Sequence, residues 1–117
     1  MMNITIKRIY EPFSKTDGYR ILIDRLWPRG IKKENAHIDK WMKEVAPSTD
    51  LRKWFNHEAE KQDEFRAKYH SELQGSAAFE ELLQIVREHK TVTLLYASKE
   101  EHYNHAIVLR QFITDSL

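Results

Sequence analysis

The spacing of apolar residues changes several times along the chain, and each change marks a different kind of element. Three short runs rich in branched and aromatic residues, at 4–9, 19–26 and 91–97, predict β-strands. In the second run Ile21, Leu22 and Ile23 are consecutive, which is typical of a strand buried on both faces. Elsewhere apolar residues recur at intervals of three and four, as they do on one face of a helix. The alternation of the two patterns favours an α/β fold.

Helical spacing recurs through the middle and the end of the chain. In the first stretch Ile38, Trp41, Met42 and Val45 fall at i, i+3, i+4 and i+7, and the pattern ends before Pro47. The other predicted helices are a short one capped by Ser48 or Thr49, a longer one over 58–74 closed by Gly75, one that begins at Ser76, and a final one from Glu101 or Asn104 to Ile113. The final helix is apolar over most of its circumference, so we expect it to be buried.

The relation between the first two strands stays open at this stage. Asp17-Gly18 is a hairpin signal, yet the eight residues from Glu11 to Gly18 exceed the usual hairpin loop. We favour a small, mainly parallel sheet of at least three strands, packed with about five helices.

Composition narrows the class of protein. A chain of 117 residues is long enough for one domain with its own core. The sequence has no Cys, which excludes disulfides, thiol nucleophiles and cysteine-ligated metal centres and is compatible with a reducing compartment. There is no segment of signal-peptide or membrane-spanning character, so we expect a cytoplasmic protein that does not enter a membrane. A net charge of +1 is too balanced for a general nucleic-acid binder.

The seven residues 24–30, Asp-Arg-Leu-Trp-Pro-Arg-Gly, concentrate charge where the second strand ends. In an open parallel sheet this edge is where ligands bind. Arg25 and Arg29 offer planar forks of donors for an oxyanion, and Asp24 is a candidate acid or base. Trp27 can stack on a ligand ring or cover the edge of the sheet. The alternative is an ion pair that only ends the sheet and holds the following loop.

A second polar segment, residues 98–105, follows the third predicted strand. We refer to this segment and to residues 24–30 as the two polar strand exits. Ser98 lies where a hydroxyl and backbone N–H groups can meet an anion near the start of the last helix. Lys99 and Asn104 are further candidate ligand contacts in this segment. His102 and His105 are candidate catalytic residues; their spacing of three also suits two metal ligands, although an exposed polar helix start is the commoner outcome. We therefore predict no metal site.

Several blocks of the sequence resemble the YeaO-like branch of the bacterial domain of unknown function 488 family. They are residues 24–30, Ala46-Pro47-Ser48, Leu51-Arg52-Lys53-Trp54-Phe55, and Leu94-Leu95-Tyr96-Ala97 ahead of Asn104. The resemblance covers nearly the whole chain and implies a small cytoplasmic α/β protein, without implying a reaction, cofactor or partner. Two positions depart from the family pattern: Tyr103 stands where His is frequent, and Gln62 where Trp is frequent. The change to Tyr103 puts a catalytic role carried by that His in doubt, although His102 and His105 flank the position and could substitute for it.

Other familiar sites are missing from the sequence. Its three glycines form no phosphate-binding or dinucleotide-binding loop, and no serine lies in the Gly-x-Ser-x-Gly context of hydrolases. Two hypotheses remain. In the first, the protein binds, and acts on or only holds, a small anionic and possibly phosphorylated ligand between the two strand exits. In the second, it is a non-enzymatic module that binds nucleic acid or a protein through the residues Arg29, Lys32, Lys33 and an exposed Trp27 or Trp54. The sequence identifies no cofactor and no oligomeric state.

Overall fold

The computed structural model describes residues 3–56, 58–100 and 104–117. Within these ranges the core is a four-stranded sheet in the order β1-β4-β2-β3. The strands are β1 (Asn3–Arg8), β2 (Tyr19–Leu22), β3 (Lys40–Trp41) and β4 (Thr91–Tyr96), and every neighbouring pair is parallel. The predicted α/β class and parallel sheet are therefore confirmed.

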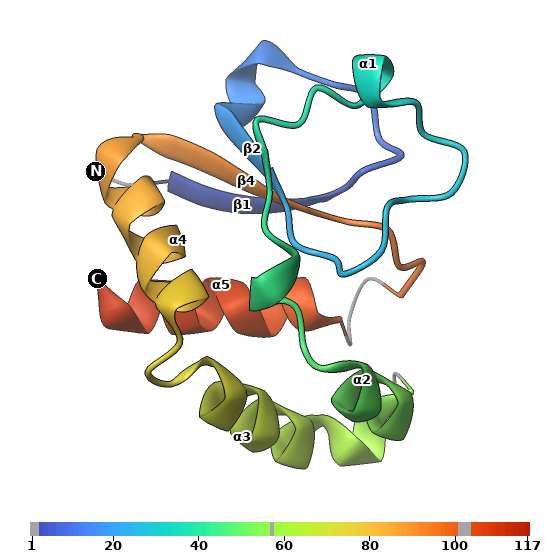
Figure 1. Cartoon of the computed structure of the whole chain (residues 1–117), viewed down its shortest axis with the longest axis vertical. Coiled ribbons are helices and arrows are strands. Elements are labelled where there is room, and N and C mark those ends of the chain that lie inside the picture. The colour runs from blue at the N-terminus through green and yellow to red at the C-terminus, as the bar shows by residue number, and fades with distance from the viewer. Residues whose placement is uncertain (1–2, 57, 101–103) are drawn as a thin grey trace.

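The α-helices divide unevenly between the two faces of the sheet. They are α1 (Lys33–Ala36), α2 (Thr49–Phe55), α3 (Gln62–Leu73), α4 (Ala77–Glu88) and α5 (His105–Ser116). Figure 1 shows α4 and α5 beneath the sheet with α2 and α3 below them, whereas α1 and long loops lie on the opposite side. Three short 3-10 turns complete the described elements: η1 (Lys15–Asp17), η2 (Lys43–Val45) and η3 (Ala59–Lys61). No helix among the described residues is long and apolar enough to span a bilayer.

The strand side chains build a different core on each face of the sheet. Side chains such as Ile21, Val92 and Leu94 pack into the larger core with the helices. Leu22 and Leu95 point the other way and join a smaller apolar cluster under the loops. Because both faces are covered, the central strands β2 and β4 read as nearly continuous apolar runs, which explains the consecutive residues 21–23.

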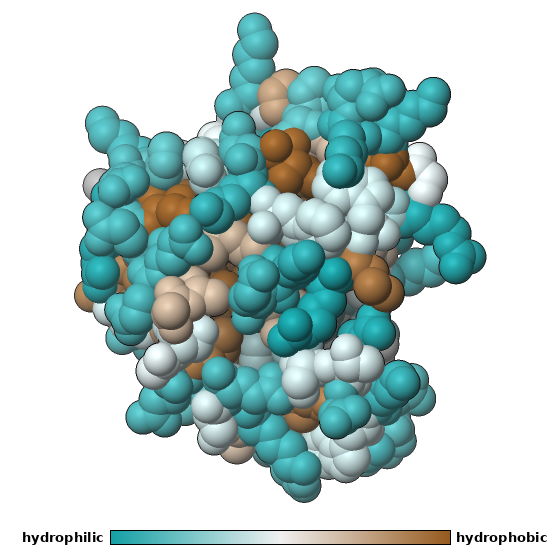
Figure 2. All heavy atoms as spheres, viewed as in Figure 1, coloured by the Kyte–Doolittle hydropathy of each residue, from teal (hydrophilic) through white to brown (hydrophobic). Residues whose placement is uncertain are grey.

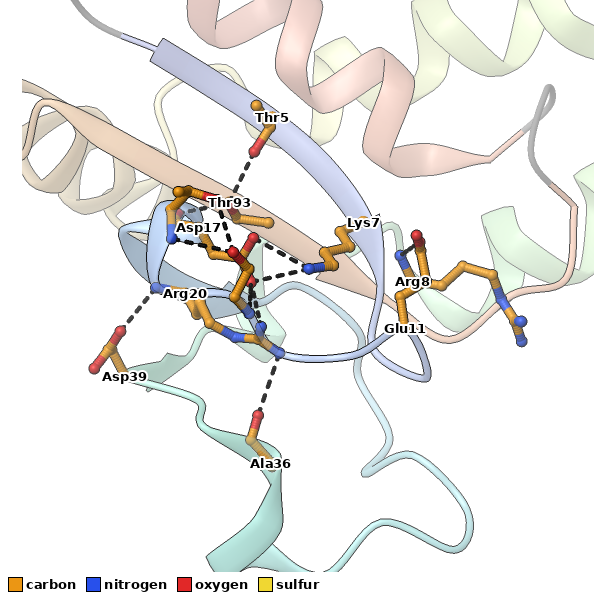
Figure 3. Close-up of polar contacts among 11 residues, drawn as sticks. Thr5, Lys7, Arg8, Glu11, Asp17, Arg20, Ala36, Asp39 and Thr93 are labelled. Atoms are coloured by element: carbon orange, nitrogen blue, oxygen red, sulfur yellow. Dashed lines mark hydrogen bonds and ion pairs between the residues drawn. The ribbon is translucent and has the colours of Figure 1, made fainter.

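A polar cluster occupies the loop-covered face nearer the amino ends of the strands (Figure 3). Asp17 is 8% exposed, and its carboxylate lies 3.1 Å from Lys7 Nζ and 2.5 Å from Arg20 Nη1. Burial opposes ionisation, but the Ser14 backbone N–H, Lys7 and Arg20 outweigh it and lower the pKa of Asp17 below its usual value. The backbone oxygen of Asp17 also accepts a hydrogen bond from Thr93 Oγ1 at 2.6 Å, which ties η1 to β4.

The prediction of a helix over residues 38–45 is wrong. The structure has the short strand β3 there, followed by η2. Met42 N–H donates to Leu22 O at 2.8 Å, so pairing with the open edge of β2 replaces intrahelical hydrogen bonds. Ile38 and Trp41 pack on the loop-covered face of the sheet, whereas Met42 and Val45 enter the helix-covered core. The apparent stripe of one helix is thus two sets of residues facing opposite ways.

The first two predicted strands are also arranged differently from a simple pair. β1 and β2 are not neighbours, because β4 lies between them and pairs with both. The strand predicted over residues 19–26 is too long, because β2 ends at Leu22. The apolar run continues beyond this point, and Pro28 lies too far along the chain to be what ends the strand. Ile23 N–H still donates to Leu95 O at 3.1 Å, and beyond it the Asp24 side chain replaces the backbone as hydrogen-bond partner of β4. The backbone pairing between β2 and β4 therefore ends at the Asp24 side chain.

The helical boundaries after residue 48 agree more closely with the sequence. Ser48 Oγ accepts Leu51 N–H at the start of α2, and Ser76 Oγ accepts Phe79 N–H at the start of α4. The stretch predicted as one helix over 58–74 begins with η3 and continues as α3. Gly75 follows α3 with φ +75°, as expected for a residue that closes a helix.

Candidate functional site

The carboxyl ends of β2 and β4 lie side by side, and from there the chain departs in opposite directions. The segment after β2 runs into the loops on one face, and β4 leads towards α5 on the other face. Such a divergence between neighbouring parallel strands opens a crevice, where ligands bind in open α/β sheets. The two polar exits predicted from the sequence therefore meet at one edge.

Asp24 joins these two exits. Its Oδ2 accepts the Ala97 N–H at 2.9 Å, and its Oδ1 lies 3.0 Å from His105 Nε2. The same His105 nitrogen is 3.1 Å from Ile23 O, with which it is aligned for a hydrogen bond. Oδ1 of Asp24 has no hydrogen-bond partner among the described residues, so His105 Nε2 lies beside it without donating to it. Trp41 Nε1 donates to the Asp24 backbone oxygen at 2.6 Å and fixes the residue from the other side.

Arg25 uses two of its five N–H donors to bind the protein itself. Its Nε donates to Pro47 O at 2.9 Å, and its Nη2 donates to Ala46 O at 3.1 Å. These bonds hold the segment before α2 against the end of β2. A guanidinium anchored in this way is oriented in advance, with less freedom to lose when a ligand approaches.

The loop that follows is shaped by three further contacts. Trp27 Nε1 donates to Ile31 O at 2.6 Å, and the Trp27 ring packs edge-on against Trp41 with centroids 5.4 Å apart. The Tyr10 hydroxyl donates to the Arg29 backbone oxygen at 2.8 Å. Gly30 has φ +80°, a backbone conformation that favours glycine, so it permits the turn after Arg29. The loop is thus held at both ends.

These segments enclose a cavity of about 370 Å³ at the carboxyl edge of the sheet. This volume is within the range of about 300–1,000 Å³ that is common for small-molecule sites. Figure 2 shows hydrophilic side chains next to hydrophobic and intermediate ones where the loop after β2 faces α2. The lining residues are Tyr10, Asp24, Arg25, Leu26, Trp27, Pro28, Arg29, Ala46, Pro47, Arg52, Phe55, Phe65, Ala97, Ser98 and His105.

The charges on the cavity wall are mainly positive. Arg25, Arg29 and Arg52 line it, and Asp24 is the acidic residue among the described lining residues. Asp24 is already engaged, as described above. In the described part of the chain, the structure gives the guanidinium groups of Arg29 and Arg52 no hydrogen bond or ion pair with the protein. These two groups are therefore available to bind an oxyanion.

Several lining residues were not singled out for the site by sequence reasoning. Arg52 and Phe55 were noted only within the block shared with the family, and they lie three apart on α2, which brings both to one side of the helix. Leu51, Trp54 and Phe55 have the spacing of one apolar helix face, but this spacing does not show that the face borders a cavity. Phe65 comes from α3, and no local signal connects it with the end of β2.

Arg8 is a further residue that the sequence analysis missed, at the end of β1. Its Nε donates to Ser98 O at 2.8 Å and its Nη2 donates to Ala97 O at 3.1 Å. The guanidinium carbon lies 5.0 Å from the centroid of the Tyr10 ring. Arg8 therefore fixes the segment after β4 and supports one of the aromatic residues of the cavity wall.

The remaining candidates after β4 have different placements. Ser98 lines the cavity, and its Oγ accepts the Glu100 N–H at 3.0 Å. Lys99 is exposed and does not line the cavity. Asn104 is fully buried and caps α5, because its Oδ1 accepts the Ile107 N–H. His102 lies outside the described residues.

A buried phenol lies below the site. Tyr69 donates to Val45 O at 2.5 Å, and its ring packs edge-on against His105 with centroids 6.5 Å apart. Burial raises the pKa of Tyr69 well above its usual value, and the charges of Glu72 and Asp24 raise it further. Tyr69 is therefore a neutral hydrogen-bond donor throughout the physiological range.

The aromatic residues of the second hypothesis already have protein partners. Nζ of Lys61 and Nζ of Lys68 lie 5.0 and 4.2 Å from the centroid of the Trp54 ring. Lys33 Nζ lies 5.8 Å from the centroid of the Trp27 ring. Among the residues that the structure describes, no three His, Asp or Glu side chains are grouped so that they could hold a metal ion.

The comparisons with known proteins place the whole chain in one family. Residues 3–117 match the inactive DUF488-N3 subclade. The chain is 46% identical over 112 residues to the uncharacterised protein YeaO of Escherichia coli, covering 96% of this chain and 97% of that protein. It is 40% identical over 110 residues to an uncharacterised protein of Mycobacterium tuberculosis, with 94% and 92% covered. No solved structure matches significantly. The chain therefore belongs to the inactive DUF488-N3 subclade and is a relative of YeaO.

Proposed function

We propose that this protein binds a small anionic molecule, a carboxylate or phosphate, in the cavity between the exits of β2 and β4. The observation that carries the proposal is the pair of guanidinium groups, on Arg29 and Arg52, that line the cavity without a protein partner among the described residues. A guanidinium matches the two oxygens of a carboxylate or phosphate and binds them through parallel hydrogen bonds.

Binding without a chemical step is the form of the proposal that has more support. The subclade that the chain matches is described as inactive. In this chain Asp24, the candidate acid or base, contacts Ala97 N–H and His105 rather than being left open to a substrate proton. His105 in turn is aligned with a backbone oxygen. Both residues serve to hold the strand exits in place.

A thermal-shift titration tests the proposal. The probes are sodium phosphate, phenyl phosphate, acetate and phenylacetate, each compared with sodium chloride at matched ionic strength. A ligand at about ten times its Kd stabilises the folded state by about 1.4 kcal/mol, which corresponds to a Tm rise of about 6 °C for a chain of this length. We expect at least one probe to produce such a rise.

Variants assign the effect to the cavity. Arg29→Gln and Arg52→Gln should each reduce the Tm rise, and the double variant should abolish it. Arg87→Gln is the matched control, because Arg87 is an exposed arginine on α4 that does not line the cavity. A rise that survives in the double variant, or that Arg87→Gln removes equally, would contradict the proposal. So would the absence of any rise with all probes at millimolar concentration.

A further inference from the structure

We infer that the molecule bound in this cavity carries a planar, apolar ring next to its acid group. This inference rests on the proposed function, because the same cavity and the same two arginines are used. It adds a statement about the uncharged part of the ligand, which the arginines alone leave undefined. The supporting observations concern the apolar wall, the exposed residues at the rim and the fixed orientation of Trp27.

The deeper part of the cavity wall is aromatic. Phe55 and Phe65 are 3% and 1% exposed, and their rings are stacked with centroids 4.1 Å apart and planes 16° apart. Both line the cavity, so a ligand that enters fully reaches ring surface rather than polar groups. Pro28 and Pro47 add further apolar surface to the wall. A fully polar anion such as glycerol phosphate would leave this surface unmatched.

The rim of the cavity exposes two large apolar side chains to solvent. Leu26 is 66% exposed and Tyr10 is 43% exposed. Of the large hydrophobic residues exposed in the described part of the chain, these two line the cavity, while Phe13 and Leu117 lie elsewhere. Neighbouring exposed apolar side chains beside a cavity are a mark of a binding site. A ligand ring that covers Leu26 and Tyr10 would remove their apolar surface from water.

Trp27 presents apolar surface in a fixed orientation. Its indole nitrogen is bonded to Ile31 O, and its ring is held edge-on by Trp41. An aromatic side chain that is already ordered loses little conformational freedom when a ligand ring packs against it. Flat ligand rings are favoured by such a wall, because ring pairs gain from offset-stacked and edge-on contacts beyond the area they bury.

The experiment compares probes that differ in one part at a time. Phenylacetate has the ring and the acid, acetate has only the acid, and phenylacetamide has the ring without the charge. Phenyl phosphate and inorganic phosphate form a second pair that distinguishes a phosphate from a carboxylate head. Affinities are measured by calorimetry and by quenching of tryptophan fluorescence on the full chain. We expect each ring-bearing anion to bind at least about tenfold more tightly than its ring-free partner, and phenylacetamide at least about tenfold more weakly than phenylacetate.

Each alternative outcome separates the inference from the proposed function. If acetate and inorganic phosphate bind as tightly as their phenyl counterparts, the ring inference is overturned and the proposed function stands. If phenylacetamide binds as tightly as phenylacetate, the anion requirement and hence the proposed function is overturned. If none of the probes binds at millimolar concentration, both are overturned.

One variant tests the apolar rim without disturbing the core. Leu26→Ser removes an exposed apolar side chain. It should weaken the binding of whichever phenyl anion binds more tightly by at least about threefold, and it should leave the affinity for the corresponding ring-free anion unchanged. Leu117→Ser is the matched control, because Leu117 is 46% exposed and does not line the cavity. Equal affinity of wild type and Leu26→Ser for both phenyl anions would overturn the inference.

Discussion

Replacing Asp24 by alanine should destabilise the protein, because this one carboxylate joins the ends of the two central strands. The substitution leaves the Ala97 N–H without its acceptor and removes the charge beside His105. Hydrogen bonds to charged groups contribute about 1.5–3 kcal/mol, and an unpaired buried donor carries a cost of similar size. The Asp24 side chain is 16% exposed, so water replaces part of the loss. We expect the free energy of unfolding to fall by about 2–3 kcal/mol.

Asp24→Asn separates the hydrogen bond from the charge. The amide oxygen of asparagine can still accept the Ala97 N–H, whereas the negative charge beside His105 is lost. This variant should therefore lose only about 1 kcal/mol. The order wild type, asparagine, alanine follows from the geometry and does not depend on any bound molecule.

Urea unfolding followed by circular dichroism measures these differences, and thermal unfolding gives a second reading. The typical unfolding entropy per residue implies a Tm change of about 4 °C per kcal/mol for a chain of this length, so Asp24→Ala should lower the Tm by about 8–12 °C. An alanine variant within about 0.5 kcal/mol of wild type, the usual size of a neutral surface change, would refute the assigned role of Asp24. An asparagine variant as unstable as alanine would refute the importance of the Ala97 hydrogen bond.

The other predictions concern the framework of the site. Tyr69→Phe leaves the buried Val45 carbonyl without its donor and should cost about 1–3 kcal/mol in urea unfolding, which a loss below about 0.5 kcal/mol would contradict. The pKa of Asp17 is lowered in the folded protein, so its carboxylate stabilises the fold above about pH 4 and this contribution is lost as the pH falls through the lowered pKa. Asp17→Asn should accordingly lower the free energy of unfolding at neutral pH and make it depend less on pH in the acid range. An unchanged dependence of stability on acid pH would contradict the role given to Asp17. Gly18→Ala places a Cβ against the Thr91 backbone at φ +68°, so we expect a loss of more than about 2 kcal/mol or failure to fold; a variant as stable as wild type would contradict it.

Sequence patterns predicted those parts of the fold whose stability is local. The serines that begin α2 and α4, and the glycine after α3, each act within one turn of the helix that they limit, so they are readable from neighbouring residues. The apolar run of β4 is equally clear, because a central parallel strand is buried on both faces. The strand order was not accessible, since inserting β4 between β1 and β2 depends on residues about 70–90 positions apart.

The region of β3 shows why local patterns failed in one place. Its apolar spacing is compatible with a helix and equally with residues that face both sides of a sheet edge. The decision is made by the free edge of β2, whose Leu22 carbonyl accepts the Met42 N–H. The hydrophobic pattern around Met42 cannot show this acceptor, because Leu22 lies 20 positions earlier in the chain. Tertiary pairing therefore overrides the local preference.

The same limit applies to the charges of the candidate site. In the sequence Asp24, Arg25 and Arg29 look equivalent, because all three follow one apolar strand within a few residues. In the structure Asp24 and Arg25 are used to join the strand ends to α5 and to the segment before α2, while Arg29 has no such bond among the described residues. The other cavity-lining arginine without such a bond among the described residues is Arg52, which comes from α2. The structural reading of the charged run therefore applies to Asp24 and Arg25, whereas the ligand-binding reading stays a proposal that rests on Arg29. The first two charges build the edge of the sheet, and Arg29 with Arg52 supplies the unneutralised positive charge on which the proposed binding of an anion depends.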